Sequence, residues 1–154
     1  MRRGTRLGVD VGRARVGVAR SDPDGILATP VETVPRDDAA IGRVRELALE
    51  VEAIEVIVGL PIALSGRSTA STEDARAFAR GLAAVLDAPV RLVDERLSTV
   101  SAHSALRSSG RSSRDSRAVV DQVAAVIILQ NALDSERTAD RPAGVLVAPD
   151  EGQA

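Results

Sequence analysis

The hydrophobic period of this sequence changes near residue 40, and that change limits the folds it can adopt. Three segments before it alternate apolar with other residues, as β-strands do. They cover residues 5–11, 14–20 and 26–34. Tight turns are predicted at Gly12-Arg13 and over 21–25, and Pro30, which cannot donate to a strand ladder, is expected in an edge strand. The chain therefore begins as a three-stranded antiparallel meander.

After this meander the spacing alternates between helical and extended. Helices are predicted over 41–51, 71–86, 98–106 and 118–133, and strands over 54–61 and 90–95. Ser71, followed three residues later by Asp74, resembles a capping box at the start of the second helix. Because a helix precedes each later strand, those strands should lie parallel to the first. The fold class is therefore α/β, a ribonuclease H-like mixed sheet with the meander, two parallel strands and flanking helices.

The length of the chain favours a single domain. Its 154 residues are enough to bury roughly two thirds of the surface of the unfolded chain. We expect a folded ribonuclease H-like domain over 1–134 and a largely loose tail over 135–154. No apolar run approaches the about 20 residues that span a bilayer, so the protein is expected in the cytoplasm and away from membranes.

Residue content restricts the metal chemistry. The chain has no Cys and a single His, His103, so neither a thiolate site nor a site built from several histidines can form. Any metal must be held by oxygen atoms, which favours Mg²⁺ or Mn²⁺.

Charge is unevenly distributed along the chain. The formal net charge is −2, yet residues 1–20 contain six arginines and one acid, and residues 91–117 contain six arginines and three acids. Arginine forks suit phosphate oxygens, and two such segments could form one phosphate-facing surface. The alternative is ordinary solvated surface charge.

Asp10 stands inside an apolar run, between Val9 and Val11. A carboxylate in a buried strand loses much of its hydration, at a large cost in free energy unless a partner compensates it. We interpret Asp10 as a functional group, and a buried ion pair with an arginine is the alternative.

Two further carboxylates accompany predicted elements. Glu95 comes just where a strand ends, the usual position of active groups in open α/β sheets, although Asp94 and Glu95 could instead be solvated turn residues. Asp121 shares a helical face with Ile128, but it could also be the N-cap of a helix that starts there. If that helix packs across the strand ends, Asp10, Glu95 and Asp121 come together beside arginine-rich segments. Three oxygen donors in such surroundings are typical of a magnesium site for phosphodiester chemistry.

Four motifs occur in order along residues 5–134. They are LGVDVGRARVGVARSDPDGILATP, VIVGLP, VDERLSTVSA and VVDQVAAVIILQ. Together they resemble the YqgF family, also called RuvX. The resemblance implies a ribonuclease H-like fold and a hydrolase, a divalent-metal-dependent nuclease that trims the 5′ end of precursor 16S rRNA during ribosome biogenesis. It also implies that Asp10, Glu95 and Asp121 are the catalytic and metal-binding residues.

The mechanism expected from these acids uses two Mg²⁺ or Mn²⁺ ions, bridged by Asp10, to activate water and stabilise the departing 3′ oxygen. Substrate phosphates are expected against Gly12 and Arg13, although Gly12 could serve only as a turn glycine. Further phosphate contacts are expected from the polar stretch over 108–117, where members of the family commonly carry Lys. Its arginines are Arg111, Arg114 and Arg117.

The expected partner is nucleic acid, with precursor rRNA favoured over junction DNA, and ribosomal precursor particles are further candidates. The first alternative is a Holliday junction resolvase-like DNA endonuclease. A lower alternative is an actin-like nucleotide-binding domain, because the opening DVG also resembles the phosphate-binding hairpin of those ATPases. They need two such domains to enclose a nucleotide, and this chain has the length of one.

Overall fold

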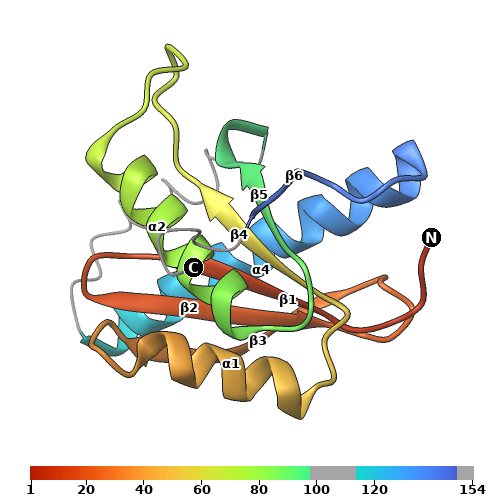
Figure 1. Cartoon of the computed structure of the whole chain (residues 1–154), viewed down its shortest axis with the longest axis horizontal. Helices are drawn as coiled ribbons and strands as arrows, with labels where there is room; N and C mark the ends of the chain where they lie inside the picture. Colours follow the sequence, from red (N-terminus) through yellow and green to blue (C-terminus); the bar gives the residue numbers. More distant parts are fainter. Residues whose placement is uncertain (98–113, 149–154) are drawn as a thin grey trace.

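The computed structural model of the chain describes residues 1–97 and 114–148 (Figure 1). Its elements are, in chain order, β1 Arg6–Val11, β2 Arg15–Ser21, β3 Ala28–Pro35, α1 Ala40–Glu50, β4 Glu55–Leu60, α2 Ala70–Val85, β5 Val90–Asp94, the 3₁₀ turn η1 Glu95–Leu97, α4 Arg114–Ala139 and β6 Val145–Leu146. The strands form one sheet in the order β3-β2-β1-β4-β5-β6.

The strand directions confirm the predicted mixed sheet. β1 pairs antiparallel with β2, and β2 pairs antiparallel with β3, which makes the meander and leaves β3, with Pro30, at an edge. β4 lies parallel to β1, and β5 lies parallel to β4. The sixth strand, β6, pairs antiparallel with β5 and was not predicted, because two residues are too short to show an alternating pattern.

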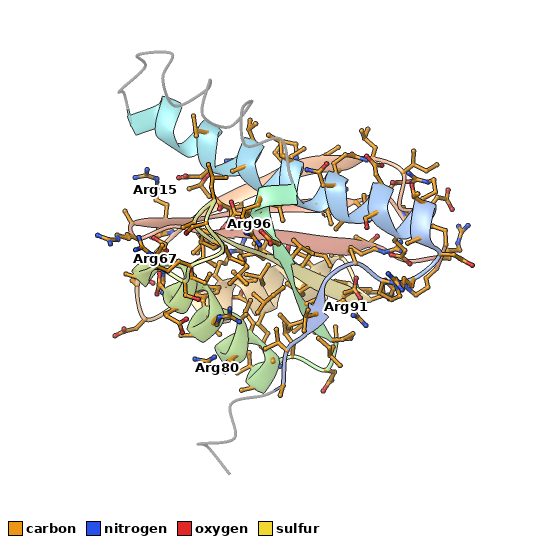
Figure 2. All side chains as sticks on the ribbon, turned by 90° about the horizontal axis from the view of Figure 1, so that it is seen from above. Arg15, Arg67, Arg80, Arg91 and Arg96 are labelled. Carbon is orange, nitrogen blue, oxygen red and sulfur yellow. The ribbon has the colours of Figure 1, made fainter. Side chains whose placement is uncertain are left out.

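The sheet separates two apolar cores. One lies under α1 and α2 and includes Leu7 and Val9 of β1 together with Phe78 of α2. The other lies under α4 and includes Ile57 of β4 and Leu129 of α4. Figure 2 shows this arrangement from above, with α4 on one side of the sheet and α1 and α2 on the other. Because successive residues of a strand point to opposite faces, the residues on either side of Val9 face α4.

The observed bounds correct one predicted helix. α4 begins at Arg114 and ends at Ala139, whereas the sequence predicted 118–133. At its start, helical backbone continues into a polar stretch that has no apolar spacing to reveal it. At its end, Glu136 points inward but is charged, so the sequence hid its burial. The helix predicted over 98–106 lies outside the described residues, as does His103.

The predicted capping box of α2 is wrong. The N-cap is Thr69, whose side chain accepts from the backbone N–H of Thr72 at 3.2 Å, while the Thr72 side chain accepts from the Thr69 N–H at 2.9 Å. Two threonines therefore make the reciprocal bonds that we expected from Ser71 and Asp74. Asp74 instead accepts two hydrogen bonds from Arg36, at 2.8 and 2.9 Å.

Beyond residue 134 the chain is more regular than expected. Residues 135–139 complete α4, and Val145–Leu146 add to the sheet. The division into a domain over 1–134 and a tail over 135–154 stays a prediction. Among the described residues, none of the helices is long and apolar enough to cross a membrane.

Candidate functional site

Asp10 is the penultimate residue of β1 and is only 7% exposed. Leu7 and Val9 point into the core under α1 and α2, so the alternation of the strand turns Asp10 to the opposite face, under α4. Its direct partner across the β1–β2 ladder is Gly17. The carboxylate that looked out of place in the sequence is therefore buried, on the face that α4 covers.

Glycines on this face let α4 lie very close to the sheet. A Cβ at Gly17 would overlap the backbone carbonyl oxygen of Asp121, and a Cβ at Gly8 would come within 2.6 Å of the Cβ of Leu129. Directly opposite residues of an antiparallel pair lie about 5 Å apart. The backbone of Asp121 thus rests on the residue that faces Asp10 across the ladder.

Asp121 lies about two turns inside α4, because the helix begins at Arg114. The N-cap alternative for Asp121 is therefore wrong. Its side chain is 15% exposed and accepts a 2.6 Å hydrogen bond and ion pair from Nε of Arg15, the first residue of β2. Arg15 was not among the residues predicted for the site. The alternation of the strand indicates its position, because Arg15 stands two residues before Gly17 and so lies on the same face of β2.

Glu95 follows β5 directly and is partly buried over β4. A Cβ at Gly59 of β4 would lie 3.1 Å from Oε2 of Glu95 and 2.5 Å from Cδ1 of Ile128 in α4. Gly59 therefore leaves space beneath the helix that the Glu95 carboxylate and the Ile128 side chain fill. Asp10 and Glu95 thus lie on the same face of the sheet, at the carboxyl ends of β1 and β5.

Asp94 has different surroundings from its neighbour. It is paired with Arg96 at 2.7 Å, and this ion pair and its hydrogen bond keep the pKa of the Asp94 carboxyl below its usual range. Asp94 is therefore a turn carboxylate held by a nearby arginine, whereas Glu95 faces β4 and α4.

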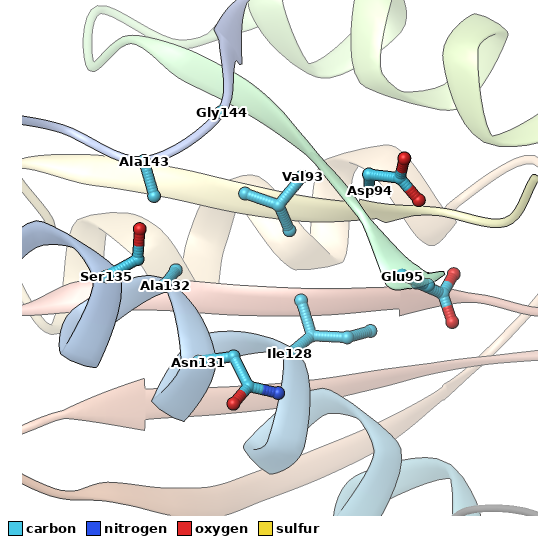
Figure 3. Close-up of a pocket in the computed structure, with 9 residues that line it drawn as sticks. All are labelled: Val93, Asp94, Glu95, Ile128, Asn131, Ala132, Ser135, Ala143 and Gly144. Atoms are coloured by element: carbon cyan, nitrogen blue, oxygen red, sulfur yellow. The ribbon is translucent and has the colours of Figure 1, made fainter. Parts of the chain in front are cut away.

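A pocket of about 170 Å³ adjoins Glu95 between β5, α4 and the segment that leads into β6 (Figure 3). It is lined by Val93, Asp94, Glu95, Ile128, Asn131, Ala132, Ser135, Ala143 and Gly144. Gly144 has a φ of +79°, and a Cβ there would overlap the carbonyl oxygen of Leu92. This glycine therefore lets the segment close the pocket against β5.

The predicted phosphate-contacting residues are only partly described. Gly12 closes the β1–β2 turn, where its N–H donates to the carbonyl of Arg15 at 2.9 Å, and a Cβ at Gly12 would lie 2.6 Å from that same oxygen. The turn therefore requires glycine, and Arg13 is exposed beside it. Arg114 and Arg117 lie at the start of α4, with side chains outside the description, and Arg111 lies outside the described residues altogether.

The three acids fit a divalent cation in type but are not yet arranged around one. Carboxylate oxygens are the ligands that Mg²⁺ and Mn²⁺ prefer. Over 1–97 and 114–148, however, no group of three or more His, Asp or Glu side chains is placed so that it could hold a metal ion. The carboxylate of Asp121 is engaged with Arg15 instead.

Known proteins are similar to almost the whole of this chain. A model of the RuvX family, described as "Holliday junction resolvase", matches residues 4–135. A protein from Clavibacter michiganensis subsp. michiganensis is 64% identical over 150 residues, which are 96% of this chain and 93% of that protein. One from Streptomyces coelicolor is 58% identical over 147 residues, 94% of this chain and 88% of that protein. Both carry the name "Putative pre-16S rRNA nuclease".

Two solved structures share the fold. The structure of RuvC from Thermus thermophilus superposes with a TM-score of 0.54 at 15% identity, covering 92% of this chain and 99% of that one. The same protein in complex with a Holliday junction substrate gives 0.58 at 12% identity, covering 93% and 99%. At such identities the likeness concerns the fold alone.

Proposed function

The chain belongs to the RuvX family, and from this premise we propose that it is a nuclease that processes the 5′ end of precursor 16S rRNA. The relatives named as pre-16S rRNA nucleases are similar to it over nearly its whole length, which supports this substrate. The observation that carries the proposal is the placement of two acids. Asp10 and Glu95 face α4 from the carboxyl ends of β1 and β5, and the backbone of Asp121 in that helix rests on Gly17, which faces Asp10 across the ladder.

We assign the same role to all three carboxylates. Asp10, Glu95 and Asp121 would hold Mg²⁺ or Mn²⁺, an ion that, once bound, lowers the pKa of water and stabilises charge on the leaving oxygen. Asp10 is the most buried of the three and is fixed by the β1–β2 ladder, so it anchors the site. The Asp121 carboxylate can become a ligand beside Asp10 only after its ion pair with Arg15 breaks.

The substrate would be held through its phosphates. The chain has no Trp and no Tyr, and its one Phe, Phe78, is buried in the core under α2 with the guanidinium of Arg36 5.0 Å from its ring centre. Stacking of bases on aromatic side chains, the usual grip on single strands, therefore has no residue to serve it here. Arginines such as Arg13, beside the turn, supply a grip that does not depend on base sequence.

The decisive experiment offers the purified protein two labelled substrates side by side, precursor 16S rRNA and four-way DNA junctions. We expect trimming of the rRNA at its 5′ end, with a requirement for Mg²⁺ or Mn²⁺ and no cleavage in EDTA. Asp10→Asn should abolish the cleavage while its thermal unfolding stays cooperative. Undiminished cleavage in chelator by metal-free protein would contradict the metal-dependent mechanism.

Junction cleavage is the second candidate function. The description of the family model as a Holliday junction resolvase favours it. A resolvase cuts the junction symmetrically, so symmetric cleavage of the junction with intact rRNA would replace the first proposal with this one.

An actin-like nucleotide site is the third and weakest candidate. Such a site lies between two domains, whereas residues 1–97 and 114–148 form one sheet with its helices. We expect no ATP hydrolysis, and no competition by micromolar ATP with nucleic acid. We also expect the protein to act in the cytoplasm, on precursor particles of the small ribosomal subunit.

A further inference from the structure

Arg15 holds a carboxylate that the proposed site needs. Its Nε lies 2.6 Å from Oδ2 of Asp121, and both side chains are partly buried, 31% and 15% exposed. Figure 2 shows Arg15 at one end of the sheet, below the first turns of α4. A cation that binds Asp121 must therefore displace the guanidinium or share the carboxylate with it.

The contact with Asp121 engages few of the hydrogen-bond donors of Arg15. A guanidinium has five N–H donors in a fixed fork, and Arg15 uses only Nε on Asp121. Other arginines are held through two nitrogens: Arg36 binds Asp74 through Nη1 and Nη2, and Arg43 of α1 binds Glu32 through Nε and Nη2. The outer nitrogens of Arg15 therefore have the geometry to receive a second anion.

The pair is also exchangeable. Both side chains keep part of their surface in contact with water, so salt and other anions can reach the guanidinium and compete for it. A phosphate of the backbone matches the guanidinium fork at least as well as one carboxylate oxygen does. Arg15 can thus leave Asp121 when a phosphate takes the place of the carboxylate on its guanidinium.

We propose that Arg15 couples substrate binding to cation binding by exchanging Asp121 for a substrate phosphate. In the free protein the guanidinium occupies Asp121, so the cation site lacks one carboxylate. A phosphodiester backbone draws Arg15 away, and Asp121 then becomes a ligand for the cation. This inference rests on the proposed function for the identity of the phosphate, and it makes Arg15 a positioning residue.

Titration calorimetry with Mn²⁺ tests whether Arg15 competes with the cation for Asp121. Arg15→Gln should bind Mn²⁺ about fivefold or more tightly than the wild type, the lower end of common coupling factors. The matched control is Arg13→Gln, which removes the same charge from the exposed turn two residues away. It should stay within about twofold of the wild type, because Arg13 is exposed and its charge acts on Asp74 in the first turns of α2. Arg15→Lys, which keeps the charge but lacks the fork, should fall between the wild type and Arg15→Gln, and it serves if Arg15→Gln does not fold.

To test whether a substrate phosphate releases Asp121, the titration is repeated with a 2′-O-methyl RNA oligonucleotide, whose integrity is checked afterwards. The RNA should tighten Mn²⁺ binding about fivefold or more in the wild type and much less in Arg15→Gln. An oligonucleotide with an uncharged methylphosphonate backbone should have no such effect on the wild type. Equal tightening in the wild type and Arg15→Gln would overturn the inference, as would Mn²⁺ binding by Arg15→Gln no tighter than by Arg13→Gln.

The outcomes separate this inference from the proposed function. Coupling through Arg15 without any cleavage of rRNA or junction would retain the inference and reject the nuclease. Cleavage that needs Mn²⁺ without any coupling through Arg15 would do the reverse.

Discussion

Asp10 of β1 and Gly17 of β2 face each other across the ladder, on the side of the sheet that α4 covers. The missing side chain at Gly17 is what lets the backbone of Asp121 rest there. An acid on the strand and an acid on the helix are therefore brought together by a residue that has no functional group of its own. The geometry of the site depends on this contact between helix and sheet as much as on the acids.

Gly17→Ala should weaken both the fold and the site. The new Cβ overlaps the Asp121 carbonyl oxygen, so α4 must shift, at about 1–3 kcal/mol as for other overpacked cores. The displacement of Asp121 should also lower the cleavage rate about tenfold or more. Urea unfolding and a cleavage assay measure the two effects.

Gly42→Ala is the control for that substitution. Gly42 lies in α1, and a Cβ there meets no atom within 4 Å. Alanine should stabilise the helix by about 0.5–1 kcal/mol without changing the cleavage rate. Equal behaviour of the two alanine variants would show that the contact at Gly17 is not needed.

Neighbouring acids should respond differently to loss of charge. Glu95→Gln should reduce cleavage about 100-fold or more, because it removes a proposed cation ligand that lies over Gly59. Asp94→Asn should keep most of the activity, because Asp94 is paired with Arg96 outside the three acids. Single-turnover cleavage rates of both variants, at saturating Mn²⁺, test this. A larger loss in Asp94→Asn than in Glu95→Gln would reverse the assignment.

Stability should fall in acid through Glu136. Hydrogen bonds from Arg2 and the charge of Arg6 lower the pKa of Glu136 from 4.5 to about 2. The stabilisation is therefore complete above pH 4.5 and is lost as the pH falls towards 2, in total about 3 kcal/mol. Urea unfolding between pH 7 and pH 2 should show this loss in the wild type and a flatter profile in Glu136→Gln.

Glu136→Gln should also lower the free energy of unfolding at neutral pH. Glu136→Gln leaves Arg6, which is 1% exposed, without its charged partner, at about 3–5 kcal/mol. Asp134→Asn is the control, since it removes an exposed pair with Arg137 and should change stability by less than about 0.5 kcal/mol. An unchanged acid profile in Glu136→Gln would exclude Glu136 as the titrating group.

The arginines between 108 and 117 should contribute to the salt dependence of binding. Replacing Arg111, Arg114 and Arg117 together by Ser should weaken RNA binding and reduce the slope of log K against log salt. For a single strand the reduction is at most about 2, or about 0.7 for each lost phosphate contact. Fluorescence anisotropy with labelled RNA over a salt series measures the slope. An unchanged slope would mean that these arginines do not touch phosphate.

Periodicity was enough to predict most of the sheet. The meander and the two parallel strands follow from residues whose burial alternates or is continuous, and those patterns are visible in the letters. The ends of α4 were not visible, because an inward charge at Glu136 resembles a surface residue. β6 was missed because Val145 and Leu146 are both exposed and carry no alternation.

The placement of the acids was only partly predictable. Asp10 stood out because a carboxylate in an apolar strand is rare, and the strand period gives its face. The strand period gives the face of Arg15, but its pairing with Asp121 does not follow from it, because the pair joins residues 106 positions apart and depends on how closely α4 approaches β2. The chemical roles of Asp10, Glu95 and Asp121 stay predictions.

Helix α4 is fastened at the end remote from Asp121. Glu136, near its last turn, accepts hydrogen bonds from Arg2 and Arg6, and Arg2 also bonds to Glu55 at the start of β4. Because this end of α4 is tied to the sheet, the helix resists sliding along its axis, and the contact between Asp121 and Gly17 holds its other end. Adjustment of the Asp121 carboxylate towards Asp10 must then come from rotation of its side chain. The ion network of Arg2, Arg6, Glu55 and Glu136 thus helps to set how the acids at the opposite end of the helix are aligned.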